Sequence, residues 1–271
     1  MSNDTLAALP CLRMASLRSF IRPHRLVLIV VAILFVALAI WLMRWDWVPR
    51  YAGDIAYGVW LTLVMLVLNC GLGFAFGVPI GLVQVTGPWP LARLARSYSN
   101  IIRGTPLLLQ LWVMYYGLGS VLPRYPGIRS SFLWPILREA WPYAILALVI
   151  SFAAYSGEVM RGAFAGVPRG ELEAGRAFGM TRWTVFHRIW FPRAVSRVLP
   201  TLSGETVFML KGIPLIATIT VPDIYGVISK VRQETFIIYE PLLLLALIYC
   251  CLTGIIVSLF RYLESKTLTR R

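Results

Sequence analysis

Residues 155–192, YSGEVMRGAFAGVPRGELEAGRAFGMTRWTVFHRIWFP, decide the fold, because an apolar helix ends within them and a basic loop begins. The apolar part carries a single acid, Glu158. The chain then passes through six arginines, which are Arg161, Arg169, Arg176, Arg182, Arg188 and Arg193. A change from apolar helix to clustered arginine is typical of a membrane span that ends on the cytoplasmic side. The stretch therefore predicts a span followed by a cytoplasmic loop.

The loop has the pattern of two short helices joined by a turn. Pro168 suits the first turn of a helix, because its missing N–H would have no partner there, and Gly179 can end that helix. Thr181 can cap a second helix, which Pro192 is expected to close. The apolar residues of this second helix recur at helical spacing and are Trp183, Phe186, Ile189 and Trp190. We predict a helix-turn-helix that lies against the membrane.

This loop resembles the EAA loop of ABC importer permeases, whose pattern is E-A-A, three residues, G, nine residues, I-x-L-P. The matching residues are Glu173, Ala174, Gly179, Ile189 and Pro192. Glycine replaces the second alanine and phenylalanine the leucine, but the glutamate and the turn glycine are kept. The resemblance implies that residues 164–193 form the docking site for an ATPase. The coupling residues it implies are Glu173, Ala174, Gly175, Arg176 and Gly179.

The composition excludes a soluble protein. Hydrophobic residues make up 58% of the 271 residues and charged residues 14%, whereas soluble domains carry about 25% charged residues. The net charge of +14 would suggest nucleic acid in a soluble chain, but no basic stripe with interleaved aromatic residues lies outside the apolar segments. Basic residues in a membrane protein mark cytoplasmic loops instead. We expect a membrane protein that binds lipid and no nucleic acid.

Six apolar segments are long enough to cross a bilayer about 30 Å thick. They lie at residues 26–43, 55–92, 100–119, 141–162, 195–222 and 241–260. We therefore predict an all-α, polytopic helical bundle of about six transmembrane helices. With this topology 16 Lys and Arg lie in the cytoplasmic segments or, in the case of Arg197, just inside the following span, and the outer segments hold 7. The bias predicts that both termini are cytoplasmic.

The division of the chain follows from these spans. Residues 1–54 would form a cytoplasmic tail and an additional first span, which is too long for a signal peptide and is retained. Residues 55–262 would form the permease core and residues 263–271 a second cytoplasmic tail. The second span contains Gly71, Gly73, Gly77 and Gly81, which we interpret as residues of close helix packing.

The third segment contains a predicted helix break at residues 103–106, RGTP, because a proline there cannot donate a backbone hydrogen bond. Together with Gln110, this segment resembles the RGTPLL-Q signature of the polar amino acid branch of these permeases. Residues 220–223, TVPD, resemble the histidine/lysine/arginine/ornithine and opine members. The resemblance implies import of a polar, basic amino acid or an opine that a periplasmic binding protein delivers.

The candidate substrate residues are the polar groups within the predicted spans. Ser151, Tyr155 and Glu158 share one helical face, and an acid in a span normally faces protein or a cavity. The alternative for Glu158 is an ion pair with Arg161, three residues on. Glu205 offers the same choice between a substrate role and a structural partner.

No enzymatic site is apparent. The chain has no Gly-Lys pair and so no phosphate-binding P-loop, and its two histidines, His24 and His187, are too far apart in the topology for a metal pair. We expect no cofactor in this chain, with ATP and Mg²⁺ bound by an ATPase dimer. The further partner implied is a second permease subunit in the bacterial inner membrane. The alternatives are a membrane-embedded enzyme or scaffold, a passive channel, or an ABC permease for glutamine or glutamate.

Overall fold

The computed structural model describes residues 43–268, together with Val27, Val30, Val31, Leu34, Ala37, Leu38 and Trp41. The chain divides into two compact units, Met1–Arg50 and Tyr51–Arg271, and the elements discussed below belong to the second unit except for the first turn of α3. The predicted first span, residues 26–43, and both predicted tails fall largely or partly outside the described residues. The structure therefore does not test the predictions for the first span and the two tails.

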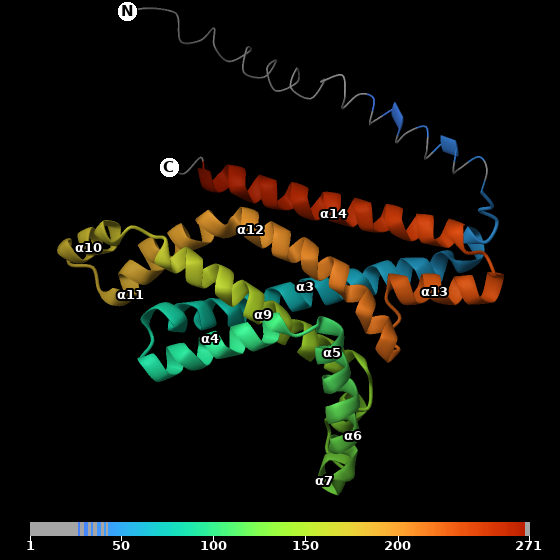
Figure 1. Cartoon of the computed structure of the whole chain (residues 1–271), viewed down its shortest axis with the longest axis horizontal. Coiled ribbons are helices and arrows are strands. Elements are labelled where there is room, and N and C mark those ends of the chain that lie inside the picture. The colour runs from blue at the N-terminus through green and yellow to red at the C-terminus, as the bar shows by residue number, and fades with distance from the viewer. Residues whose placement is uncertain are drawn as a thin grey trace, which may run out of the picture. The chain divides into compact units, whose positions relative to one another are not determined.

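The described part of the chain is helical and contains no strand. Its long helices are α3 (Val48–Thr86), α9 (Trp141–Ala165), α12 (Phe191–Gly212) and α14 (Tyr239–Leu268). Their axes are roughly aligned in Figure 1, with α12 running opposite to α9 and α14, and both of these helices pack against α12. By length and hydropathy, four helices within the described residues can cross a membrane, or five if one bent pair counts as a span. The predicted all-α membrane bundle is confirmed.

The bent pair is the predicted helix break. Helix α4 (Trp89–Gly104) ends before Thr105, and α5 (Leu107–Trp112) begins after Pro106, with an angle of 103° between the two helical stretches. Thr105 is extended because the proline that follows excludes the helical conformation. The side-chain amide of Gln110 donates to the carbonyl oxygens of Ile102 at 2.7 Å and Thr105 at 3.0 Å. These bonds satisfy carbonyls that the break leaves without helical partners.

Helix α4 begins earlier than the sequence analysis predicted. Arg93 and Arg96 were expected in a cytoplasmic loop, but both lie within α4, and only residues 87 and 88 separate this helix from α3. The physical reason is that Pro90 falls in the first turn of α4, where a missing N–H is tolerated, and no breaker follows before Gly104. This correction places two arginines on a helix that enters the membrane.

Glycines allow α3 and α9 to pack closely. A Cβ atom on Gly73 would lie 2.8 Å from Phe152, and one on Gly81 would lie 2.7 Å from the carbonyl oxygen of Gly157. At Gly77 the Cβ would overlap the hydroxyl of Ser156. The packing interpretation is confirmed for these three glycines, whereas nothing lies within 4 Å of the corresponding position at Gly71.

Short helices follow α5 and α12 in the chain. The segment after α5 passes through the π-helix Val113–Leu118 and the short elements α6 (Gly119–Val121), Leu122–Arg124, α7 (Pro126–Arg129) and α8 (Trp134–Leu137). After α12, the 3-10 helix Ile213–Ile219 leads to α13 (Ile224–Thr235), which occupies the predicted outer segment. Asp223 caps α13 by accepting from the backbone N–H of Gly226 at 2.9 Å. Thr62 of α3 accepts from the backbone N–H of Ile224, so α13 is tied to α3.

Candidate functional site: a cytoplasmic docking loop and a charged cluster between helices

The basic loop forms the predicted helix-turn-helix. Its first helix is α10 (Arg169–Ala177), with Pro168 at the N-cap, one residue before the predicted first turn. Gly179 follows with φ of +77°, a conformation that favours glycine. The second helix, α11 (Arg182–Val185), is capped by the hydroxyl of Thr181, which accepts from the backbone N–H of Thr184 at 3.2 Å.

The prediction that Pro192 closes the second helix was wrong. The chain continues from α11 through the π-helical turn Phe186–Trp190 directly into α12. Pro192 lies in the first turn of α12, and the wider hydrogen-bond spacing of the preceding π-turn accommodates a residue that has no N–H. The loop is thus continuous with a spanning helix.

Three side-chain contacts join the docking loop to the spanning helices. The indole Nε1 of Trp190 donates to the carbonyl oxygen of Phe164, at the end of α9, over 2.9 Å. Arg193 forms an ion pair with Glu171 at 3.0 Å, which ties α12 to α10. Arg197 donates to the carbonyl oxygen of Gly166. These contacts tie the loop to α9 and α12.

The packing around Gly175 explains why a glycine replaces the second alanine of the EAA pattern. It is buried, and a Cβ atom there would lie 2.7 Å from the side chain of Ile189 and 3.3 Å from that of Val185. Such distances are shorter than ordinary contact, so an alanine would require the side chain of Ile189 to move. The glycine lets α10 pack against the second helix.

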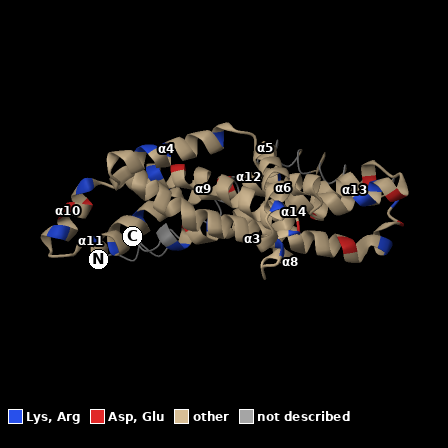
Figure 2. Cartoon of the chain, turned by 90° about the horizontal axis from the view of Figure 1, so that it is seen from below, with Lys and Arg blue, Asp and Glu red and all other residues tan. Residues whose placement is uncertain are grey.

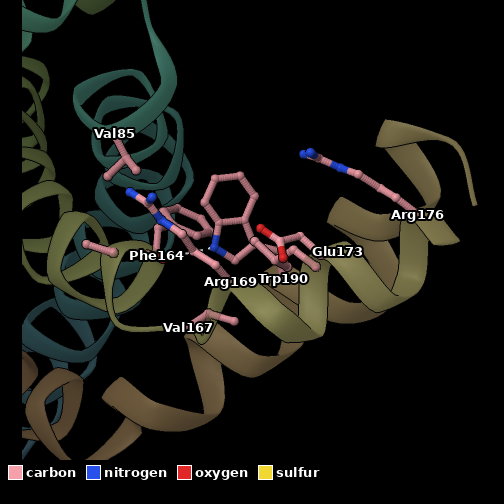
Figure 3. Close-up of a pocket in the computed structure, with 9 residues that line it drawn as sticks. Val85, Phe164, Val167, Arg169, Glu173, Arg176 and Trp190 are labelled. Carbon is pink, nitrogen blue, oxygen red and sulfur yellow. Dashed lines mark hydrogen bonds between the residues drawn. The ribbon is translucent and has the colours of Figure 1, made fainter.

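A cleft of about 350 Å³ lies beside α10, where Figure 3 shows its lining. The exposed Glu173 faces it near the ring of Trp190, and the side chain of Arg176 extends from α10 toward the same cleft (Figure 3). Ala174 is also exposed. An acid, an indole and an arginine around one cleft can accept a basic or aromatic side chain of another protein.

Two exposed aromatic residues at the tip of the loop were not predicted as docking residues, although Trp183 was placed on the apolar face of the second helix. Phe178, which precedes Gly179, is 86% exposed, and Trp183 is 71% exposed. Large aromatic side chains outside the apolar spans are enriched in protein interfaces. Their position in a polar loop was the signal that could have identified them. They widen the candidate docking surface beyond Glu173.

The predicted substrate residues lie where α4, α9 and α12 meet. Glu158 accepts from Arg161, with Nε at 2.8 Å and Nη2 at 2.5 Å from Oε1, and both side chains are partly exposed. The ion pair that the sequence analysis kept as the alternative for Glu158 is therefore present.

Tyr155 connects this ion pair to the neighbouring helices. The guanidinium of Arg103, at the end of α4, lies 5.4 Å from the centre of the Tyr155 ring, which is within the range of a cation–π contact. Phe208 of α12 packs against the same ring with centroids 5.6 Å apart. Glu205 is half-buried on α12, and the positive charge of Arg103 acts on its carboxyl group.

The structure does not bring all the predicted substrate residues to one surface. Ser151 is only 2% exposed and lies inside the bundle, whereas Tyr155, Glu158 and Glu205 are half-buried. Arg103 and Phe208 complete the cluster and were not predicted as site residues. The helix break beside Arg103 was the available signal, because a polar residue at an interrupted span tends to line a cavity.

The charges of this cluster are of both signs. Two carboxylates, of Glu158 and Glu205, and two guanidinium groups, of Arg103 and Arg161, occur within one region of three packed helices. Each carboxylate can bind a cationic group and each guanidinium can hold a carboxylate through two parallel hydrogen bonds. The arrangement is suited to a ligand that carries both charges.

Apolar helices long enough to span a membrane, a basic helix-turn-helix loop joined to them and a charged cluster between them are features of a membrane transport subunit. Residues 73–269 match the family described as binding-protein-dependent transport system inner membrane component. The chain belongs to this family. The predicted identification as an ABC importer permease is thereby confirmed.

The relatives of known function are permeases. The octopine transport system permease protein OccM of Rhizobium meliloti is 40% identical over 207 residues, which is 76% of this chain and 83% of OccM. The nopaline transport system permease protein NocM of Agrobacterium fabrum is 34% identical over 204 residues, which is 75% of this chain and 83% of NocM. Transport rather than catalysis is the function of these relatives.

A solved structure also matches. It is that of an amino acid ABC transporter with histidines, at 27% identity and a TM-score of 0.69, and the match covers 83% of this chain and 99% of that chain. The family implies an ATP-hydrolysing subunit and a binding protein as partners, and an inner-membrane location. The EAA-type loop of residues 164–193 is typical of the family.

Proposed function

We propose that this chain carries a basic amino acid or an arginine-derived opine across the bacterial inner membrane. The observation that carries the proposal is the mixed-charge cluster of Arg103, Glu158, Arg161 and Glu205 around the ring of Tyr155. A polar ligand that leaves water must recover its hydration energy, and charge-assisted hydrogen bonds in a sparsely solvated site can supply it.

Each part of such a ligand has a matching group in the cluster. An ammonium or guanidinium group would bind the carboxylates of Glu158 and Glu205, and it could displace Arg161 from Glu158. A carboxylate would bind Arg103. The ring of Tyr155 would stack on a planar guanidinium, as it does with Arg103 in this conformation. Ser151, although buried here, lies one turn from Tyr155 and stays in the proposed set.

The relatives favour an arginine-containing ligand. OccM and NocM are named for octopine and nopaline, both of which are arginine derivatives that add carboxylates to a guanidinium. Two guanidinium groups in the cluster suit a ligand with more than one carboxylate. A permease for glutamine or glutamate remains the second candidate. Neither ligand has a cationic side chain that two acids beside the binding position could bind.

The proposed assembly has two permease subunits, identical or similar, and an ATPase dimer that binds ATP and Mg²⁺. The ATPases would dock on Glu173, Ala174, Gly175, Arg176 and Gly179, and a periplasmic binding protein would deliver the ligand. This chain itself would bind no cofactor. Closure of the ATPase dimer would tilt the docking loop, and α9 and α12 would move with it.

We expect both termini to lie in the cytoplasm. The reason is the excess of Lys and Arg in the segments on the side of the docking loop. Cysteines introduced at Ser2 and Thr269, in a variant without the four native cysteines, should react with an impermeant thiol reagent only after cell lysis. Labelling of either one in intact cells would contradict the topology.

The substrate class is tested by uptake. Proteoliposomes that contain the permease, its ATPase and its binding protein should take up labelled arginine or octopine only with ATP inside. Excess unlabelled basic amino acid or opine should block this uptake, and glutamate should not. Block by glutamine or glutamate alone would favour the second candidate, and uptake without ATP would indicate a channel. The affinity of the binding protein alone, measured in parallel, separates its selectivity from that of the permease.

A further inference from the structure

Helix α4 has three different faces. The first is packed inside the protein and contains the buried Ala92 and Ser99. The second is exposed and apolar, with Leu91, Leu94 and Ile101 between 53% and 68% exposed. The third is polar and continues along the whole helix at intervals of three or four residues. It consists of Trp89, Arg93, Arg96, Asn100 and Arg103.

The polar face begins at the cytoplasmic end of α4 with a basic cleft. This cleft, of about 380 Å³, lies at the turn between α3 and α4 and is lined by Trp89, Arg93, Arg96 and Gln84. The guanidinium of Arg93 lies 5.1 Å from the centre of the Trp89 ring, and Arg96 donates to the backbone carbonyl of Gln84 at 3.3 Å. The side-chain oxygen of Gln84 is buried without a hydrogen-bond partner.

The same face ends at the proposed substrate cluster. Arg103 lies over the ring of Tyr155. Figure 2 shows basic residues distributed along α4. Within the part of the chain that the structure describes, no acid forms a salt bridge with Arg93, Arg96 or Arg103. Apart from the hydrogen bond of Arg96 to the carbonyl of Gln84, their donors are thus available to an anionic ligand.

Geometry allows successive contacts. Residues 93, 96, 100 and 103 rise by about 5 to 6 Å at each step, so the face extends about 15 Å along the helix. A carboxylate held by two guanidinium groups at such spacing can form its next pair of hydrogen bonds before it leaves the previous ones. Unpaired arginines in a membrane segment are costly and generally mark the route of a ligand or ion.

We propose that the polar face of α4 is the cytoplasmic exit route of the substrate, on which Arg96 and Arg93 bind its carboxylate in turn after Arg103 releases it. This inference rests on the proposed function and extends it from the binding position to the path of release. The Trp89 and Arg93 cleft would be the last binding position before the cytoplasm. The ligand class is a carboxylate-bearing amino acid or opine.

The test replaces the two arginines that lie outside the substrate cluster. With saturating loaded binding protein, Arg93→Gln and Arg96→Gln should each slow ATP-driven uptake about tenfold, the effect of losing one charge-assisted hydrogen bond. The KM for loaded binding protein should stay within a factor of about two, because docking on the outer side is unchanged. Arg93→Lys and Arg96→Lys should restore most of the rate. Arg261→Gln, an exposed arginine on α14, is the matched control and should have no effect.

Labelling gives an independent readout. A cysteine in place of Arg96 should react more slowly with a thiol reagent during turnover than at rest, because passing substrate covers it. A cysteine in place of Leu94, on the exposed apolar face, should react at the same rate in both conditions. Modification of the Arg96→Cys variant with a cationic reagent should restore uptake, and modification with an anionic reagent should not.

Several results would overturn the proposal. Wild-type uptake by both glutamine variants would remove the polar face from the route. A defect that appears only in vesicles with acidic phospholipid would mean that the cleft binds lipid headgroups instead. The wild-type protein tests the proposed function separately. If that function is wrong, the wild type itself will carry no basic amino acid or opine. The effects of the variants are judged on whichever carboxylate-bearing ligand the wild type transports.

Discussion

Replacing Gly179 by valine is expected to abolish uptake while the chain remains inserted in the membrane. Gly179 has a φ of +77°, and a residue with a branched side chain in this region costs about 1 to 3 kcal/mol. Space does not limit the substitution, since nothing lies within 4 Å of a Cβ atom at this position. The effect is therefore on the backbone of the turn alone.

The turn orients the docking surface. The N–H of Gly179 donates to the carbonyl of Arg176 at 2.9 Å, and that of Met180 donates to Gly175 at 3.1 Å. If valine forces the turn into another conformation, these bonds break and α10 no longer packs on the second helix. The exposed rings of Phe178 and Trp183 then lose their common orientation, and with it the surface that the ATPase would recognise.

The measurement is twofold, with uptake by reconstituted vesicles and copurification of the ATPase with the permease. Both should fall at least tenfold in Gly179→Val and also in Glu173→Lys, which reverses a charge that faces the docking cleft. Gly170→Ala is the matched control, because that glycine lies on α10 with ordinary φ and open space around it. Normal uptake by Gly179→Val would show that the loop does not couple ATP hydrolysis to transport.

The docking loop could be predicted from sequence because its determinants are local. The glycine that ends α10, the threonine that caps α11 and the arginines that mark a cytoplasmic loop each act within a few residues. The prediction that Pro192 ends the second helix was wrong because a proline is common both just after a helix and in the first turn of the next one. The continuous path from α11 to α12 depends on a π-helical turn, which has no simple sequence pattern.

The charged cluster could be predicted only in part. Helical spacing placed Tyr155 and Glu158 on one face, and the ion pair with Arg161 is local to the same helix. The approach of Arg103 from α4 depends on where that helix ends and how it crosses α9. Such a contact joins residues more than 50 positions apart, and no local pattern specifies it. The burial of Ser151 is likewise a result of packing between helices.

We expect transport to require a carboxylate at position 158 itself. Exchanging the charges of Glu158 and Arg161 tests this expectation. In the double variant Glu158→Arg with Arg161→Glu, an ion pair can still form, since the two residues remain three positions apart. If the pair only stabilises the bundle, the swap should transport normally. If Glu158 binds the substrate, the swap should be folded and inactive, because a guanidinium then occupies the position of the acid.

We expect the second result. Glu158→Gln should also reduce uptake of a cationic substrate about a hundredfold, the effect of losing a hydrogen-bonded charge worth about 3 kcal/mol. Its melting temperature should change little, because the side chain of Arg161 is 41% exposed and can extend to the cytoplasmic interface when the acid is removed. The binding protein's affinity for ligand should not change.

The control is another acid–base ion pair, which joins α3 to α13 away from the cluster. Asp54 and Lys230 lie 3.4 Å apart with both side chains more than half exposed, so Asp54→Asn removes an acid from a pair without touching the site. Its uptake should equal that of the wild type. A transporting swap variant, or a Glu158→Gln variant that loses stability and regains it when Arg161→Gln is added, would assign Glu158 a structural role. Glu205, the other acid beside Arg103, would then be the carboxylate that binds the cation.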